Sequence, residues 1–294
     1  MINNYLFKVI ILTSLALIAF AANSVLCRLA LGYDAIDAAS FTVIRLLSGS
    51  IVLLIIIATT RNTTEFSTKG SWTASFMLFL YATTFSYAYI SLDTGTGALI
   101  LFGSVQITMI LLSLISGTRL HMTEWAGVVI AFMGFVYLIL PGVTMPSITG
   151  FMLMTIAGIA WGIYTLKGRS SKNPLMDTAF NFLRTTPFVV ILAISTMNNV
   201  NYSYEGIVLA LLSGGLTSGI GYTIWYIALG GLSSTQAAVL QLSVPIIAAL
   251  GGTIFVSEAI TFRLSISAAM VLGGILIVVL GKYYFTQHKN RVKT

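Results

Sequence analysis

Apolar runs of about 20 residues follow one another along nearly the whole chain, separated by short polar gaps. A run of that length spans the hydrocarbon core of a bilayer as an α-helix. Hydrophobic residues make up 57% of the chain and charged residues only 8%, whereas soluble domains carry roughly a quarter charged residues. No run alternates like the strands of an outer-membrane barrel. The sequence therefore predicts an all-α integral membrane protein.

We expect ten transmembrane helices, and the distribution of basic residues supports that number. With the N-terminus inside, eleven Lys and Arg residues fall on the inner side, and Arg263 alone falls outside. This separation follows the positive-inside rule and predicts that both termini are cytoplasmic. The expected helices are 7–30, 38–60, 71–92, 96–116, 124–141, 150–168, 177–197, 206–229, 236–256 and 262–284.

The chain also contains an internal repeat. A Phe-x-x-x-Arg pattern that ends at Arg45 recurs 139 residues later, where it ends at Arg184. We therefore expect two repeats, 1–142 and 147–294. Each holds five helices, and this odd number makes the second repeat cross the membrane in the opposite direction. Inverted repeats are typical of secondary transporters, whose sites lie near mid-membrane between the repeats.

Two prolines fall inside expected helices, Pro187 in 177–197 and Pro245 in 236–256. A proline in a helix interior lacks an N–H and clashes with the carbonyl four residues earlier. At Pro245 this frees the carbonyl of Gln241 near mid-membrane, where it must be satisfied by protein, water or ligand. We expect both prolines to act as kinks for gating.

The repeat places Gln106 where the second half has Pro245. An amide that faced lipid at this depth would be costly, so Gln106 should face a cavity or a partner helix. A hydrogen bond between helices is an equally weighted alternative to substrate contact. We expect Gln106, Asn23 and the backbone near Gln241 to contact polar groups of a substrate.

Arg45 and Arg184 are charges within the expected helices. Such charges are costly and are often functional. Since each repeat has one, we interpret them as structural charges that snorkel or pair with a carboxylate, and substrate contact is the alternative. No Asp or Glu falls at the centre of an expected helix, which argues against a proton-coupled cation exporter.

Large aromatic side chains within the expected helices could line a cavity or form interfacial belts. We expect six of them to shape a substrate pocket: Tyr81, Phe85, Trp161, Tyr164, Tyr222 and Trp225.

Several segments resemble the drug/metabolite transporter superfamily, EamA-type branch. They are Trp161-Gly162, the stretch Gly219-Ile-Gly-Tyr-Thr-Ile-Trp-Tyr-Ile-Ala-Leu229, and Gln241-Leu-Ser-Val-Pro245 followed by Gly252 and Glu258. The resemblance covers essentially the whole chain. It implies ten helices in two inverted five-helix repeats, a bacterial inner membrane, and export of amino acids or related small metabolites.

We therefore expect a secondary transporter that exports small polar metabolites, most of all amino acids, by alternating access. The alternatives are a cation or drug exporter of the same superfamily, or a membrane-embedded binding or sensor protein. No phosphate-binding loop or zinc-protease motif is present, and Cys27 is the single cysteine, so we expect no enzyme activity, cofactor or metal. The expected partners are a small-molecule substrate and the lipid bilayer, with no nucleic acid; we expect a monomer and leave a dimer open.

Overall fold

The fold is entirely helical in the part of the chain that the structure describes. The computed structural model describes residues 2–59, 70–115, 117, 122–140, 145–168, 171–232, 237 and 240–291. Eight helical segments in these ranges are long and apolar enough to cross a membrane, and Val244–Phe255 is a shorter apolar helix. The expected all-α membrane architecture is confirmed. The expected joint between the repeats falls partly outside the described residues, at 141–144.

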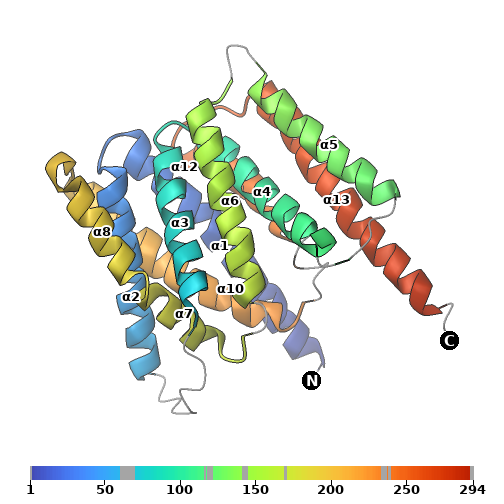
Figure 1. Cartoon of the computed structure of the whole chain (residues 1–294), viewed down its shortest axis with the longest axis horizontal. Coiled ribbons are helices and arrows are strands. Elements are labelled where there is room, and N and C mark those ends of the chain that lie inside the picture. The colour runs from blue at the N-terminus through green and yellow to red at the C-terminus, as the bar shows by residue number, and fades with distance from the viewer. Residues whose placement is uncertain are drawn as a thin grey trace.

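The first half forms five helices that run alternately up and down (Figure 1). Their bounds are α1 Ile2–Gly32, α2 Ala38–Thr59, α3 Trp72–Tyr89, α4 Thr94–Ile115 and α5 Met122–Ile139. Each corresponds to one expected helix.

The second half begins and ends with undivided helices, but the helices between them are interrupted. The bounds are α6 Ile148–Gly168, α7 Pro174–Leu183, α8 Thr186–Thr196, the 3₁₀-helix η1 Met197–Asn199, α9 Tyr204–Leu211, the π-helix η2 Leu212–Ile220, α10 Gly221–Leu229, α12 Val244–Phe255 and α13 Phe262–Arg291. The expected helix 177–197 is therefore α7 plus α8, and the expected helix 206–229 is α9, η2 and α10 in continuous succession.

Both prolines begin helices and do not bend them from within. α7 ends at Leu183, four residues before Pro187, and the helical turn before α12 ends at Gln241, four residues before Pro245. These are the positions where the proline ring would clash with a helical carbonyl. Each proline lies in the first turn of the new helix, where a missing N–H costs nothing. The expectation that they lie in helix interiors is wrong.

Side chains satisfy the carbonyls at the break between α7 and α8. The hydroxyl of Thr185 donates to the carbonyl oxygen of Phe182 at 2.6 Å, and the hydroxyl of Thr186 donates to that of Leu183 at 2.6 Å. Backbone groups at membrane depth need such partners because no bulk water reaches them. The break is thus a stable feature of the fold.

α6 packs against α3 and α4, and α1 contacts α3, α4, α10 and α12, while α5 and α13 lie side by side at one edge and α8 lies at the opposite edge (Figure 1). α5 and α13 approach closely because Gly127 has no side chain. A Cβ at this position would lie only 2.5 Å from the carbonyl oxygen of Gly274. The two termini lie on the same side of the molecule. We call this side the terminal side and the other the distal side.

Candidate functional site

A buried arginine lies at the centre of the molecule. Arg45 of α2 is 1% exposed. Its Nε donates to Ser218 Oγ at 3.2 Å, and its Nη2 donates to the phenol oxygens of Tyr81 and Tyr222 at 3.2 and 3.1 Å. The guanidinium carbon lies 5.2 Å from the ring centroid of Tyr81 and 5.0 Å from that of Phe85, where ring faces stabilise a cation. No described carboxylate pairs with Arg45, so hydroxyls and rings take the place of the expected partner.

Asn23 of α1 extends this network. Its Oδ1 accepts hydrogen bonds from Ser213 Oγ at 2.7 Å and Thr217 Oγ1 at 3.0 Å, and its Nδ2 donates to Tyr81 Oη at 3.5 Å. Asn23 is 2% exposed, so these bonds replace water. We call the buried network the polar cluster; its members are Asn23, Arg45, Tyr81, Ser213, Thr217, Ser218 and Tyr222.

Aromatic rings pack around the polar cluster. The ring of Trp161 on α6 lies 4.6 Å from that of Tyr222 and 4.9 Å from that of Tyr81, measured between centroids. Phe20 of α1 packs edge-on against Trp225 at 5.6 Å, a favoured geometry for aromatic pairs. All six aromatic residues expected at a pocket are buried here: Tyr81, Phe85, Trp161, Tyr164, Tyr222 and Trp225. We call these six and Phe20 the ring cluster.

A small void lies among the side chains of the two clusters. Its volume is about 10 Å³, roughly the space that one water molecule needs. A metabolite does not fit, because ligand pockets measure about 300 to 1,000 Å³. The void, which we call the central chamber, is therefore closed in this conformation. Its lining is Phe20, Asn23, Tyr81, Phe85, Leu101, Phe102, Trp161 and Tyr222.

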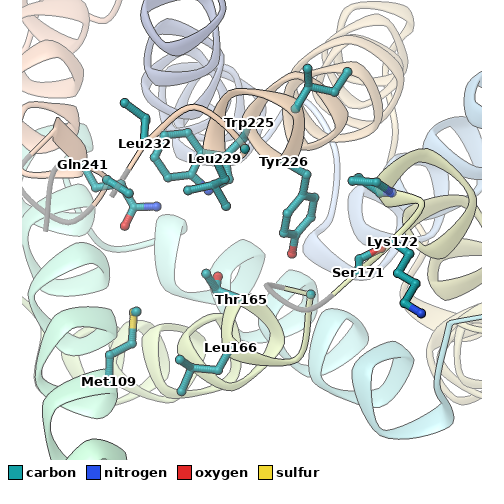
Figure 2. Close-up of a pocket in the computed structure, with 15 residues that line it drawn as sticks. Met109, Thr165, Leu166, Ser171, Lys172, Trp225, Tyr226, Leu229, Leu232 and Gln241 are labelled. Atoms are coloured by element: carbon teal, nitrogen blue, oxygen red, sulfur yellow. The ribbon is translucent and has the colours of Figure 1, made fainter. Parts of the chain in front are cut away.

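A much larger cavity opens on the terminal side. This vestibule has a volume of about 500 Å³, and Figure 2 shows it between Thr165 and Leu166 on one wall and Tyr226 and Leu229 on the other. It reaches inward as far as Trp225, a member of the ring cluster. Its described lining is Met109, Thr165, Leu166, Gly168, Ser171, Lys172, Pro174, Trp225, Tyr226, Ile227, Leu229, Gly230, Leu232, Ala237 and Gln241.

Gln106 and Gln241 meet at the vestibule. The Nε2 of Gln106 lies 3.4 Å from the Oε1 of Gln241, and both residues are 3% exposed. Of the two interpretations of Gln106, the structure thus displays the hydrogen bond between helices. Gln241 also lines the vestibule (Figure 2), so the amide pair lies where a solute that entered from the terminal side would arrive.

Ionic contacts join neighbouring elements on the distal side. Arg28 Nε contacts Glu258 Oε1 at 2.8 Å, and Arg28 Nη2 contacts Asp93 Oδ1 at 3.4 Å. The backbone N–H of Thr94 donates to the other oxygen of Glu258 at 2.8 Å. Burial and the carboxylate of Glu258 raise the pKa of Asp93, and the guanidinium of Arg28 opposes them. These contacts, which we call the distal clasp, join α1, the turn between α3 and α4, and the segment after α12.

The remaining expected residues lie outside the centre. Arg184 occupies the break between α7 and α8, and its guanidinium carbon lies 5.5 Å from the ring centroid of Trp72. Pro187 and Pro245 begin α8 and α12 as described above. Although the repeat relates Arg184 to Arg45, the two arginines therefore have different surroundings.

The sequence interpretation missed the hydroxyl groups of η2. Gly215-x-x-x-Gly219 is a spacing typical of helix packing, and it accounts for the glycines but not for Thr217 and Ser218 between them. Ser213, Thr217 and Ser218 are at most 3% exposed. These three hydroxyl residues lie close together among glycines in the expected helix 206–229. That run could have indicated a polar face toward the centre.

Comparisons with known proteins agree with this architecture. The chain matches the model of the EamA-like transporter family over residues 7–140 and 148–280. An uncharacterized protein of Pseudomonas aeruginosa is 45% identical over 271 residues, which are 92% of this chain and 94% of that protein. A protein of Salmonella typhimurium named a probable amino-acid metabolite efflux pump is 23% identical and covers 68% of this chain and 72% of its own length.

A solved crystal structure has the same fold. It aligns with a TM-score of 0.62 and 18% identity over 91% of this chain and 98% of its own. An uncharacterized transporter of Archaeoglobus fulgidus is 26% identical over 92% of this chain and 96% of its own. With its apolar helices, the chain is a multi-pass membrane protein. Since the family model matches both halves, the chain belongs to the EamA-like transporter family.

Proposed function

We propose that this protein is a secondary transporter that exports small polar metabolites, with amino acids as the foremost class, across the bacterial inner membrane. In this proposal it is a transporter and no enzyme. The substrate class is supported by the printed name of the Salmonella typhimurium relative, a probable amino-acid metabolite efflux pump. The repeats 1–142 and 147–294 would exchange conformations to expose the site alternately to each side.

One observation carries this proposal: the molecule is open on one side of its centre and closed on the other. The vestibule of about 500 Å³ leads from the terminal side to Gln241 and Trp225. On the distal side, Arg28 ties Glu258 and Asp93 together. An asymmetric opening around a buried polar centre is the arrangement that alternating access requires.

The distribution of basic residues supports one orientation of the chain in the membrane. We propose that the terminal side is cytoplasmic, because eleven of the Lys and Arg residues fall there in the ten-helix topology. The structure would then represent an inward-open state. A cytoplasmic solute would enter the vestibule, reach the amide pair of Gln106 and Gln241, and pass into the central chamber as the distal clasp opens.

The lining residues favour a neutral or anionic solute over a cation. Among the described residues, neither the vestibule nor the central chamber has an Asp or Glu in its lining. A cation exporter would need a carboxylate there, and Asp93 and Glu258 are instead held in the distal clasp. The geometry therefore supports the metabolite exporter over the cation or drug exporter.

The test is transport by purified protein in liposomes, with Gln106→Ala as the first variant. Loss of the amide removes a hydrogen bond worth about 0.5 to 1.5 kcal/mol, so flux should fall roughly two- to tenfold. Thr253→Ala is the matched control, because Thr253 is an exposed polar residue of α12 that bonds only to its own helix. Full flux in Gln106→Ala at equal protein yield would remove Gln106 from the site, and no flux of any metabolite in the wild type would refute the proposed function.

A further inference from the structure

The guanidinium of Arg45 has more hydrogen-bond donors than its surroundings use. Nε donates to Ser218, and Nη2 donates to Tyr81 and Tyr222. Nη1 is buried, yet none of the described residues offers it an acceptor. An arginine carries five N–H groups in a rigid planar fork that matches a carboxylate in two-point contacts. One arm of this fork therefore remains open at the centre of the molecule.

The positive charge of Arg45 is also without a counter-charge among the described residues. Arginine stays protonated in proteins, so it cannot avoid burial by losing its proton. Buried charges are normally paired with an opposite charge, but the described carboxylates form no ion pair with Arg45. Phenol oxygens and ring faces compensate the charge only in part. A mobile anion is the partner that this environment lacks.

Two tyrosines connect the guanidinium to the central chamber, whose lining does not include Arg45 itself. Tyr81 and Tyr222 both contact Arg45 Nη2, and both line the chamber. Their phenol oxygens are 3.4 Å apart, so two neutral acceptors stand together at the guanidinium. A carboxylate that entered the widened chamber would replace two neutral acceptors with one charged group, and charge-assisted bonds are roughly twice as strong as neutral ones.

We propose that Arg45 binds the carboxylate of the transported molecule. The inference rests on the proposed function and deepens it, because it names the chemical group that the site recognises. From the sequence alone, Arg45 is interpreted as a structural charge. We assign it a role in binding because its Nη1 has no acceptor among the described residues. Arg184, its counterpart in the other repeat, packs on Trp72 away from the central chamber and has no such role.

The rest of the site specifies the body of the molecule. Nε1 of Trp225 is another of the buried polar groups without a partner among the described residues, and Trp225 lines the vestibule and packs on Phe20 of the chamber lining. Apart from the amide of Asn23 and the phenol oxygens of Tyr81 and Tyr222, the chamber lining presents rings and apolar side chains, and its described members include no carboxylate for an ammonium group. The substrate class is therefore a small carboxylate with an apolar or aromatic body. Amino acids belong to this class, and their amino group is not essential for recognition.

The first experiment uses the wild-type protein and four probes that share one body. They are phenylalanine, 3-phenylpropionate, 3-phenylpropanamide and 3-phenylpropylamine. Ligands that bind the folded state raise its melting temperature. Both carboxylates should bind about 10- to 100-fold more tightly than the amide and the amine, as expected for loss of a charged hydrogen-bond partner. Counterflow in liposomes should rank the probes in the same order.

The second experiment changes Arg45 and keeps its repeat-related counterpart as the control. Arg45→Lys retains the charge but loses the fork, so its preference for carboxylate over amide should shrink about tenfold or more. Arg45→Gln should abolish the preference. Arg184→Lys should keep the wild-type preference for carboxylate over amide, because Arg184 is not part of the chamber lining.

The outcomes separate the two proposals. Equal binding and flux of the amide and the carboxylates in the wild type overturn the role of Arg45 while export itself stands. Transport of none of the probes, together with none of a wider metabolite panel, refutes the proposed function and this inference with it. If the Arg45 variants fail to fold, the wild-type probe series can still overturn the role of Arg45, since it requires no substitution.

Discussion

At the scale of single residues, the central site depends on how closely the backbone of α2 approaches the π-helix η2. A Cβ on Gly214 would overlap the hydroxyl of Ser48 and the carbonyl oxygen of Arg45. On the α2 side, a Cβ on Gly49 would lie 2.5 Å from the ring of Phe182 and 3.1 Å from the carbonyl oxygen of Gly214. Only glycine permits this approach, which brings Ser218 within reach of Arg45.

Gly214→Ala should therefore destabilise the protein. The backbone of α2 would have to move away, and overpacking of this kind costs about 1 to 3 kcal/mol. The melting temperature in detergent should fall, and binding of any substrate should weaken as Arg45 shifts. Gly273→Ala is the control, because a Cβ there meets nothing within 4 Å. A Gly214→Ala protein as stable as Gly273→Ala would show that the contact between α2 and η2 yields at no cost.

The sequence singled out the rarer buried polar residues, with Asn23 and Gln106 expected at a substrate and Arg45 interpreted as a structural charge, and it missed the common ones. Asn23, Gln106 and Arg45 stand out because amides and charges are scarce at membrane depth. Ser213, Thr217 and Ser218 do not, since hydroxyl groups in membrane helices often bond to their own helix. Thr223 Oγ1, for example, donates to the carbonyl oxygen of Gly219 at 2.9 Å. To distinguish hydroxyl groups that bond to another helix from those that bond to their own, one must know how the helices pack.

At the scale of elements, the positions of helices followed from the sequence better than their internal structure. Apolar length predicted the helices of the first half, but the break before Pro187 and the turn before Pro245 were expected as kinks within continuous helices. The π-helix has no comparable signature, because Tyr204–Leu229 is one continuous apolar segment. The wider turns of a π-helix have no signature in the periodicity of apolar residues.

The distal clasp is the element that the proposed transport cycle must open. Arg28 and Glu258 are mostly buried, with side-chain exposures of 18% and 13%, whereas the side chain of Asp93 is 58% exposed. Gly252 fits beneath it, since a Cβ there would lie 2.6 Å from the carboxylate of Glu258. Exposed ion pairs contribute little to stability, whereas removal of one partner from a buried ion pair is strongly destabilising. For the partly buried pair of Arg28 and Glu258 we expect an intermediate cost.

Glu258→Gln should shift the protein toward distal opening. Loss of the ionic contact should cost about 1 to 2 kcal/mol, which changes the open population roughly five- to thirtyfold. The reporter is Thr94→Cys in a Cys27→Ala background, because Thr94 is fully buried beside Glu258. Its labelling rate by a maleimide from the distal side should rise by that factor.

Glu205→Gln controls for the change of charge. Glu205 is exposed in the first turn of α9, at the same end of the molecule, and its substitution should leave the Thr94→Cys labelling rate unchanged. An equal rate in Glu258→Gln and Glu205→Gln would mean that the clasp does not hold the distal side closed.

At the scale of the whole molecule, the two sides of the centre differ in one conformation. The terminal side is hollowed to the depth of Trp225, while the distal side is tied by the clasp. The repeat suggested such an asymmetry in principle but not its direction, because two inverted halves allow either side to open. Which side is open depends on small differences in packing between the repeats, and these are not apparent in the sequence.

Side-specific labelling tests the orientation and the open side together. In a Cys27→Ala background, Leu229→Cys lies on the vestibule wall and should react with an impermeant maleimide added from the cytoplasmic side. Tyr204→Cys, at a distal position that is 86% exposed, should react only from the opposite side. Labelling of Leu229→Cys from the external side alone would reverse the proposed topology.

The π-helix η2 also affects how the chain spans the membrane. The segment Tyr204–Leu229 uses 26 residues, whereas α3, its counterpart in the first repeat, uses 18. A π-helix, with hydrogen bonds between residues five apart, has more residues per turn than an α-helix. η2 therefore contains more residues than an α-helix of the same length would need. A one-residue deletion in an ordinary transmembrane helix rotates every later side chain by about 100°. Here a deletion within η2 can be absorbed by rewinding it toward α-helix, so this segment should tolerate changes of length that α3 does not.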